Sequence, residues 1–249
     1  MTHSAIRLEY HGAEARLTLS RAATGNALTL PDIREARDAI AQAGSRPEVR
    51  VLRICAEGDQ FCVGRAPEGG APAAGQATSE DLRVRLVGPI LALYRALHTL
   101  DIVSVAQVQG DAHGLGCALV AACDIAVASR TARFSLPEMS KDLPPTLALS
   151  ALARKVQPKV AASMVLGLAT LSADEAVRGG IVGEVVEHAA LPGRVDEIVA
   201  LLGARHPVAL ATVKRYLRAA QAADFDMCAE MAASMLAGAM PAIRAGAAH

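Results

Sequence analysis

The stretch VQGDAHGLGCALVAACD, residues 108–124, decides the fold of this 249-residue chain. The apolar segment IVSVAQVQG (102–110) overlaps its start and leads into a turn that contains His113 and three glycines, Gly110, Gly114 and Gly116. An apolar segment of helical length follows and ends on an acid, Asp124. A buried strand, a turn and a buried helix in this order are typical of α/β proteins with crossover connections. The glycines also leave the first N–H groups of the helix uncovered, and those groups have no acceptor inside the helix.

A second turn of the same kind lies earlier in the sequence. Gly114 precedes Leu115 at the predicted start of the helix, and in GDQFCVGRAP (58–67) Gly64 precedes Arg65 after another predicted strand. Close packing alone would also favour glycine at such turns. If the two turns face each other, however, the N–H groups of Arg65 and Leu115 would form an oxyanion hole, in which each donor contributes on the order of 10²–10³ in rate.

Composition argues against several functional classes. The chain has 25 basic and 25 acidic residues, 2% aromatic residues and no Trp, so we expect no nucleic-acid partner. The five cysteines form no CxxC pair, which disfavours a zinc site or a disulfide framework. No apolar run reaches the length of a membrane span or of a signal-peptide core, so we expect a cytoplasmic protein with no membrane partner, no metal and no disulfides.

Periodicity and capping residues predict an α/β protein followed by a helical region. The predicted elements are a β-hairpin (6–19), a helix capped by Thr29, a strand (49–58), a helix with its apolar face on Leu82, Leu86, Ile90, Leu93 and Leu97, the strand–turn–helix of the opening stretch, and a helix with a capping box at Ser172. A Gly-, Pro- and Ala-rich stretch after Gly64 is predicted to be a long mobile loop. From about residue 192 onward the pattern is helical only.

Three stretches, in order and at consistent spacing, resemble the crotonase superfamily, also called the enoyl-CoA hydratase/isomerase family. FCVGRAPEG (61–69) resembles the first oxyanion loop of that family, F-C/A-A-G-A-D. Residues 108–139 resemble V-N-G-x-A-x-G-G-G-x-E-L-A-L-A-C-D-x-x-I-A followed by F-x-x-P-E, and residues 171–186 resemble S-A-x-E-A-x-x-x-G-L-V-x-x-V-V. The likeness extends from about residue 6 to about residue 220.

The resemblance implies an architecture and partners. It implies a crotonase (ClpP-like) spiral of ββα units over residues 1–191, which binds and converts an acyl-CoA thioester, and a C-terminal helical trimerisation region over residues 192–249. Members of this family are usually homotrimers or dimers of trimers. No cofactor is implied, because the coenzyme A is part of the substrate.

The resemblance also assigns roles to residues of the two glycine turns. It places the thioester oxygen between the backbone N–H groups of Arg65 and Leu115. It implies that Gly64, Ala66 and Gly114 lie against the substrate. The glycines of the opening stretch are then explained, because a thioester carbonyl can reach the Leu115 amide only where side chains are missing.

The sequence departs from the family pattern at two places. The glutamate expected two residues after G-G-G is Ala118 here, whereas the glutamate of F-x-x-P-E is retained as Glu138. In the first loop, Arg65 and Ala66 replace Ala-Asp, and the Arg65 side chain either reaches the CoA phosphates or obstructs the entrance. The resemblance thus leaves Glu138 as the catalytic acid/base group.

Other residues are candidates for supporting roles. His113 and Asp111 share the turn with Leu115 and are candidate auxiliary acid/base groups, although both residue types are also common in structural turns. Glu68 lies on the predicted mobile loop. Lys214, on the basic face of a C-terminal helix, is a candidate ligand of the CoA phosphates if that face is not simply solvated.

A single carboxylate supports some reactions better than others. Hydration of a 2-enoyl thioester is shared between two glutamates in the family, and loss of one costs about 10²–10⁴ in rate. Migration of a double bond needs one base, which removes a C2 proton and returns it to C4. Family membership thus favours enoyl-CoA hydration and residue chemistry favours Δ3–Δ2 isomerisation, while a thioester hydrolase or a catalytically weak acyl-CoA-binding or assembly subunit stays open.

Overall fold

The computed structural model describes residues 4–66 and 78–246 and contains two sheets. The central sheet has the order β1-β2-β3-β4-β6-β9; β1 and β2 are antiparallel and the other neighbours are parallel. The short sheet has the order β5-β7-β8. The strands are β1 (Ile6–His11), β2 (Glu14–Leu19), β3 (Val51–Ala56), β4 (Val103–Val108), β5 (Ala112–His113), β6 (Ile125–Ser129), β7 (Arg133–Ser135), β8 (Leu171–Ser172) and β9 (Glu184–Val186).

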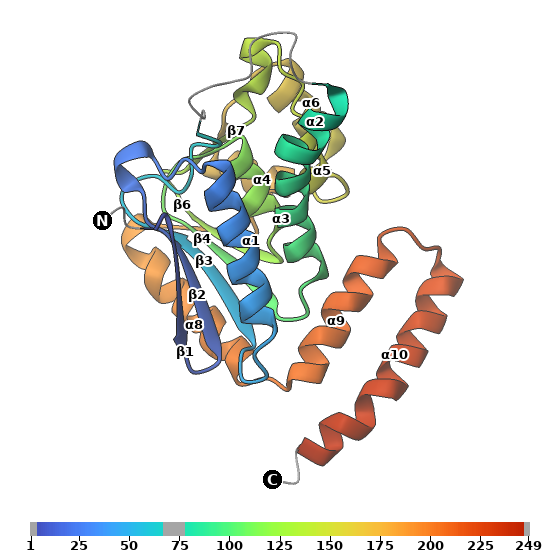
Figure 1. Ribbon diagram of the computed structural model, residues 1–249. Coiled ribbons are helices and arrows are strands. Elements are labelled where there is room, and N and C mark those ends of the chain that lie inside the picture. Colours follow the sequence, from blue (N-terminus) through green and yellow to red (C-terminus); the bar gives the residue numbers. More distant parts are fainter. Residues whose placement is uncertain (1–3, 67–77, 247–249) are drawn as a thin grey trace.

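Helices cover both faces of the central sheet (Figure 1). α1 and α3 pack together on one face, and α8 covers the other, where its apolar side chains meet those of β3, β4 and β6. The α-helices are α1 (Leu30–Gly44), α2 (Ser79–Leu82), α3 (Gly88–Thr99), α4 (Leu115–Ala122), α5 (Thr146–Leu152), α6 (Pro158–Leu166), α7 (Ala173–Gly179), α8 (Leu191–Gly203), α9 (Pro207–Ala220) and α10 (Phe225–Gly246). Shorter turns are η1 (Ala22–Thr24), η2 (Arg83–Val87), η3 (Pro137–Lys141) and η4 (His188–Ala190).

A unit of long-sheet strand, short-sheet strand and helix recurs along the chain, as β4–β5–α4 and again as β6–β7–α5. All eight residues of α4 are buried, so this helix passes through the interior between the two sheets. Its burial on every side explains why the opening stretch is apolar throughout, without the polar stripe of a surface helix. The prediction of an α/β protein with repeated ββα units is confirmed.

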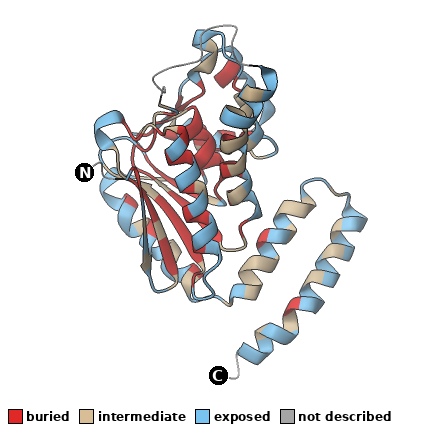
Figure 2. Cartoon of the chain, in the orientation of Figure 1, coloured by how far each residue is buried: buried red, intermediate tan, exposed pale blue. Residues whose placement is uncertain are grey.

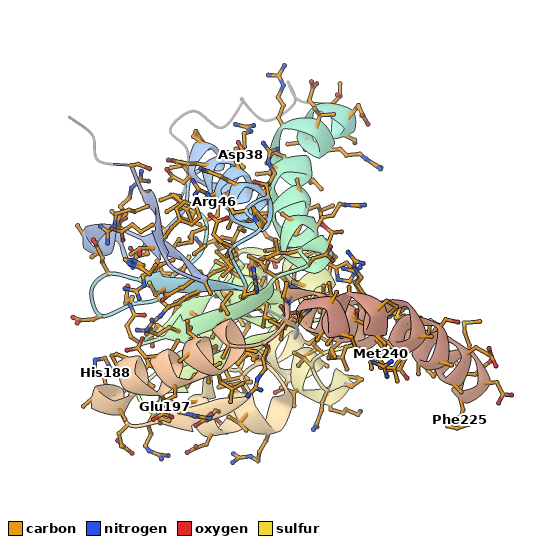
Figure 3. All side chains as sticks on the ribbon, turned by 90° about the horizontal axis from the view of Figure 1, so that it is seen from below. Asp38, Arg46, His188, Glu197, Phe225 and Met240 are labelled. Atoms are coloured by element: carbon orange, nitrogen blue, oxygen red, sulfur yellow. The ribbon has the colours of Figure 1, made fainter. Side chains whose placement is uncertain are left out.

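The C-terminal helices α9 and α10 form a hairpin that projects from the body (Figure 1). Most of its surface is exposed or half-buried, in contrast to the buried interior of the body (Figure 2). Phe225 lies at the far end of the hairpin and is 82% exposed (Figure 3). α8 belongs to the body, although the predicted boundary between residues 191 and 192 falls at its start, because Leu191, Val195 and Leu202 are buried against the sheet.

The predicted helix with Leu82 to Leu97 on its apolar face is interrupted at Gly88–Pro89. α2 continues into the π-helical turn η2, and α3 then begins at Gly88. Pro89 lacks an N–H group and disturbs the helical ladder, which explains the position of the π turn. Leu82 was expected on the apolar face but is exposed, whereas Ile90, Leu93 and Leu97 are buried as predicted. The predicted mobile loop falls largely on residues 67–77, which lie outside the described residues. No helix within the described ranges is long and apolar enough to cross a membrane.

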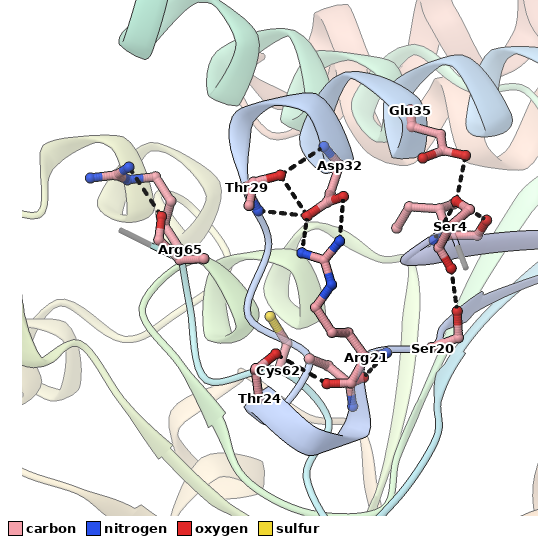
Figure 4. Close-up of polar contacts among 12 residues, drawn as sticks. Ser4, Ser20, Arg21, Thr24, Thr29, Asp32, Glu35, Cys62 and Arg65 are labelled. Carbon is pink, nitrogen blue, oxygen red and sulfur yellow. Dashed lines mark hydrogen bonds and ion pairs between the residues drawn. The ribbon is translucent and has the colours of Figure 1, made fainter. Parts of the chain in front are cut away.

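A buried carboxylate fixes the start of α1. Thr29 and Asp32 form the predicted cap, now seen as a full capping box, and Asp32 also binds the Arg21 guanidinium at 2.7 and 3.1 Å (Figure 4). Asp32 therefore joins the segment before the helix to the helix itself. This segment, residues 21–29, leads to the candidate site described below.

We expect Asp32→Ala to lower the free energy of unfolding by about 2–3 kcal/mol, because it removes the cap and leaves Arg21 without its carboxylate. Asp38→Ala on the same helix is the matched control: Asp38 is exposed, so the change should stay within about 0.5 kcal/mol. Urea denaturation followed by circular dichroism measures both. Equal effects of the two substitutions would contradict this account of the helix start.

Candidate active site

The two glycine turns of the sequence lie next to each other. A parallel bridge joins Cys62 to Ala112, and the His113 N–H donates to the Cys62 carbonyl at 2.9 Å. A Cβ atom built on Gly64 would lie 4.0 Å from the Leu115 nitrogen. Both Gly64 (φ 113°) and Gly114 (φ 52°) have positive φ, a conformation that glycine adopts without steric cost.

The N–H groups of the two turns that have no acceptor within the described residues include those of Arg65 and Leu115. Leu115 is the first residue of α4, where an N–H group has no partner inside the helix. Arg65 forms a parallel bridge with Leu28, and the two hydrogen bonds of this bridge are made by the residues on either side of Arg65. The Leu28 N–H donates to the Gly64 carbonyl at 3.0 Å, and the Ala66 N–H donates to the Leu28 carbonyl at 2.9 Å. The Arg65 N–H therefore points away from Leu28. The two donors meet the first requirement of an oxyanion hole, two free N–H groups on adjacent turns.

Glu138 lies directly against these turns. It follows β7 on η3, and its Oε1 would be 2.8 Å from a Cβ atom on Gly114. The residue is half-buried, and its Oε2 is fully buried with no hydrogen-bond partner in the described part of the chain. Burial raises the pKa of Glu138 above its ordinary value, although a hydrogen bond from its own amide opposes this. An unpaired carboxylate with a raised pKa beside two free N–H groups has the properties of a general base.

Apolar and weakly polar side chains surround the carboxylate. Ala118 is fully buried one helical turn after Gly114, on the same face of α4, so no acidic side chain stands beside Glu138 there. Cys117 on α4 and Tyr94 on α3 are also buried. Burial first, and the charge of Glu138 second, raise the pKa of Cys117 to about 12 and raise the pKa of Tyr94 well above its ordinary value. Tyr94 was missed in the sequence because it lies among the apolar residues of its helix face.

His113 and Asp111 hold strands together. His113 is the cross-strand neighbour of Ser135, and its Nδ1 lies 2.8 Å from the Ser135 Oγ. Its Nε2 lies 3.6 Å from Asp111 Oδ2, while Asp111 Oδ1 accepts a hydrogen bond from the Arg133 N–H at 3.2 Å. These contacts tie the strand before Leu115 to the strand before Glu138. The geometry favours the structural interpretation of both residues over a role in proton transfer.

Lys214, the candidate ligand of the CoA phosphates, is paired with groups of the protein itself, and its role toward a ligand stays a prediction. It is buried, and its Nζ lies 2.7 Å from Asp124 Oδ2 and donates to the Ile102 carbonyl at 2.9 Å. It lines a cavity of about 820 Å³ between α9 and the body, which does not include Glu138 or either glycine turn. Asp124 also accepts hydrogen bonds from the Ser104 N–H and hydroxyl groups, so its carboxylate is used inside the fold.

The side chain of Arg65 and the residue Glu68 complete the set of candidates from the first glycine turn and the loop after it. The Arg65 side chain is exposed and donates to the Ala66 carbonyl at 3.3 Å, apart from the Arg21–Asp32 pair (Figure 4). Glu68 lies outside the described residues. Among the residues that are described, no group of three or more His, Cys, Asp or Glu is arranged to hold a metal ion.

We expect Glu138→Gln to raise the free energy of unfolding at pH 7 by about 1 kcal/mol, because it replaces an ionisable carboxylate that has no ion-pair partner in a half-buried position by a neutral amide. The raised pKa determines how this effect depends on pH, because folded Glu138 binds a proton more tightly than unfolded Glu138 does. The wild type therefore gains stability as the pH falls through the pKa of folded Glu138, and the difference in unfolding free energy between variant and wild type should become small in acid. Denaturant titrations at several pH values test this, with the exposed Glu230→Gln as control. A destabilised Glu138→Gln at pH 7 would show that the carboxylate is paired.

Known proteins with this sequence pattern and fold are enoyl-CoA hydratases and related proteins. The family model described as enoyl-CoA hydratase/isomerase matches residues 10–240. The short-chain-enoyl-CoA hydratase of Clostridium acetobutylicum is 29% identical over 224 residues, 89% of this chain and 84% of that protein. The mitochondrial enoyl-CoA hydratase domain-containing protein 3 of Xenopus laevis is 33% identical over 191 residues, 76% of this chain but only 62% of that protein.

Solved structures agree with the sequence matches. An enoyl-CoA hydratase of Mycobacterium smegmatis superposes with a TM-score of 0.86 at 27% identity, covering 95% of this chain and 91% of that one. The human enoyl-CoA hydratase domain-containing protein 3 superposes with a TM-score of 0.85 at 24% identity, over 94% of this chain and 91% of that one, which shows the shared fold. The chain therefore belongs to the enoyl-CoA hydratase/isomerase family of the crotonase superfamily.

Proposed function

We propose that this protein converts acyl-CoA thioesters through an enolate, with Glu138 as the proton-transferring group and the N–H groups of Arg65 and Leu115 as the oxyanion hole. The observation that carries the proposal is the position of the unpaired Glu138 carboxylate, whose Oε1 comes within 2.8 Å of the Cβ position of Gly114. A thioester whose oxygen accepts from the two N–H groups would have its C2 atom next to this carboxylate. Gly64, Gly114 and Ala66 would then lie along the bound thioester.

The reaction that needs only these groups is Δ3–Δ2 isomerisation. Glu138 removes a proton from C2 of a 3-enoyl-CoA, and the electron pair moves into the thioester to give a dienolate whose oxygen is held by the two amides. Glu138, now protonated, returns the proton to C4, and the double bond then lies between C2 and C3. Atoms and charge balance without a second acid, which fits Ala118 at the position where the family pattern has its other glutamate.

Hydration of a 2-enoyl-CoA is the second candidate, and the named relatives favour it. The proteins of Clostridium acetobutylicum and Syntrophomonas wolfei are named short-chain-enoyl-CoA hydratase and crotonyl-CoA hydratase. In this chain Glu138 would have to both position the water and supply the proton, because Ala118 supplies neither. We therefore expect hydration to be slower than isomerisation by about 10²-fold or more.

We expect the purified protein to isomerise a 3-enoyl-CoA faster than it hydrates crotonyl-CoA, with both reactions followed by the absorbance of the conjugated thioester. Glu138→Gln should lower kcat for isomerisation by about 10²- to 10⁴-fold, while the exposed Glu230→Gln leaves it unchanged. In the wild type, kcat/KM should rise as the pH increases through the raised pKa of Glu138, because the base must be ionised.

Ala118→Glu is the second arm of this experiment. A carboxylate at that position adds the missing acid and should increase crotonyl-CoA hydration relative to isomerisation, provided that a circular dichroism spectrum shows an intact fold. If neither substrate reacts while acyl-CoA still binds, the protein is an acyl-CoA-binding or assembly subunit. Release of free coenzyme A from a saturated acyl-CoA would identify a thioester hydrolase instead.

We also propose that the chain assembles into trimers or dimers of trimers through the α9–α10 hairpin. Large apolar side chains are exposed on this hairpin: Val213, Leu217, Phe225, Met227 and Leu236. An exposed apolar surface on a projecting element favours burial against another copy. Light scattering at micromolar concentration should give a multiple of three times the 25.7 kDa chain mass, and a monomer mass would contradict the proposal.

A further inference from the structure

The loop between β3 and Arg65 has no regular secondary structure, yet two buried side-chain amides bind its carbonyl groups. The loop spans residues 57–64, and the two amides belong to Asn26 and Gln109. Asn26 is fully buried and Gln109 is 9% exposed. We call this pair the amide clamp. Neither the composition nor the motifs of the sequence singled out these residues.

Gln109 forms one half of the amide clamp. Its Nε2 lies within hydrogen-bond distance of three carbonyl oxygens, those of Ala56 at 3.1 Å and of Gly58 and Gln60 at 3.0 Å each. Its Oε1 is buried and has no partner within the described ranges. A flipped amide would place that oxygen against three carbonyl oxygens, so electrostatic repulsion fixes the orientation. Two loop carbonyls and the carbonyl of Ala56, the last residue of β3, thus converge on one nitrogen.

Asn26 forms the other half of the amide clamp; it precedes the loop in the sequence, whereas Gln109 follows it. Its Nδ2 donates to the Glu57 carbonyl at 2.9 Å and to the Gln60 carbonyl at 2.8 Å, and its Oδ1 accepts from the Arg21 N–H at 2.9 Å. Its φ of 55° is left-handed, a conformation that asparagine tolerates better than most residues. The Gln60 carbonyl is therefore held by both halves of the clamp.

Backbone bonds extend this anchoring as far as Arg65. The Val63 N–H donates to the Gly25 carbonyl at 2.9 Å, and the Gly64 carbonyl accepts from Leu28. Phe61 and Cys62 both donate to the Asp111 carbonyl at 3.1 Å. The Arg65 N–H has no acceptor within the described residues and follows a segment that these bonds anchor. Its direction depends on where the carbonyls of residues 57–60 are held.

We propose that Asn26 and Gln109 are positioning residues that aim the Arg65 N–H at the thioester oxygen. The inference rests on the proposed oxyanion hole and adds the groups that preorganise its first donor. A donor held in place before the reaction stabilises developing charge without reorganisation, whereas misplacement by about 1 Å costs about 10²-fold in rate. Leu115 needs no such support, because the buried helix α4 fixes it.

The test compares Gln109→Met with Gln107→Met. Both substitutions replace a glutamine at or just beyond the end of β4 by an apolar side chain of similar length, but the Gln107 Oε1 binds the Arg53 guanidinium and not the loop. Infrared spectra of bound butyryl-CoA, labelled with ¹³C at the thioester carbonyl, report hydrogen bonding to that oxygen. We expect the low C=O stretching frequency of the wild-type complex to persist in Gln107→Met and to move toward the free-ligand value in Gln109→Met.

Kinetics give a second readout that a general loss of stability would not produce. Gln109→Met should lower kcat for isomerisation by about 10- to 100-fold with little change in KM, because the donor acts mainly on the enolate. Gln107→Met should leave kcat close to the wild-type value. An unchanged carbonyl frequency and kcat in Gln109→Met would overturn the proposal. If Gln109→Met does not fold, Asn26→Gly, which accepts the positive φ, removes the other half of the clamp.

Failure of the proposed function gives a different result from failure of the clamp. If the wild type binds no acyl-CoA, the proposed function is wrong. Amide hydrogen exchange of residues 57–66 in the ligand-free protein then tests whether the amide clamp holds the loop in place, independently of any substrate. Faster exchange in Gln109→Met than in Gln107→Met would then support the clamp. Equal exchange in the two variants would overturn it.

Discussion

The contact between the two glycine turns is the constraint on which the rest of the site depends. The Cys62–Ala112 bridge holds the turns together, and the His113 N–H, which donates to the Cys62 carbonyl, maintains that contact; the Gly114 N–H donates to the Ser135 carbonyl and joins the second turn to β7. Buried backbone groups are normally paired because an unpaired one costs free energy. The free N–H groups of Arg65 and Leu115 lie on adjacent turns, and a ligand oxygen is a partner that would satisfy both.

The carboxylate next to the turns fits the same interpretation. Glu138 has one oxygen buried in the interior without a hydrogen-bond partner and the other beside Gly114, so the folded protein keeps an ionisable group where folding alone would favour a neutral one. Functional sites commonly retain such strain, since a base that is already paired cannot accept a proton. The apolar neighbours on α4 preserve this state because they offer no hydrogen bond to the carboxylate.

The sequence predicted those features that local pattern controls. The hairpin, the caps at Thr29 and Ser172 and the turn before Leu115 follow from residue types close together in the chain, and all are present. Features set by distant partners were not predicted. The sequence did not show that Lys214 pairs with Asp124, ninety residues earlier, and the helix periodicity that placed Tyr94 in an apolar face could not show its proximity to Glu138. The roles of Arg65, Leu115 and Glu138 came from motif resemblance, and their spacing alone would not have assigned them.

The two proposed oxyanion donors differ in how the fold holds them, and this difference has a consequence for the family. The Leu115 N–H belongs to a helix buried on all sides, so its position cannot change without disturbing the core. The Arg65 N–H lies at the end of a loop that is held by the side-chain amides of Asn26 and Gln109. Asn26 accepts a hydrogen bond from the Arg21 N–H, and the Arg21 guanidinium binds Asp32 in the capping box of α1 (Figure 4). Substitutions along this chain of contacts can move one donor while leaving the other, together with Glu138, in place. The first loop is therefore the part of the site where the chemistry can be changed without loss of the fold.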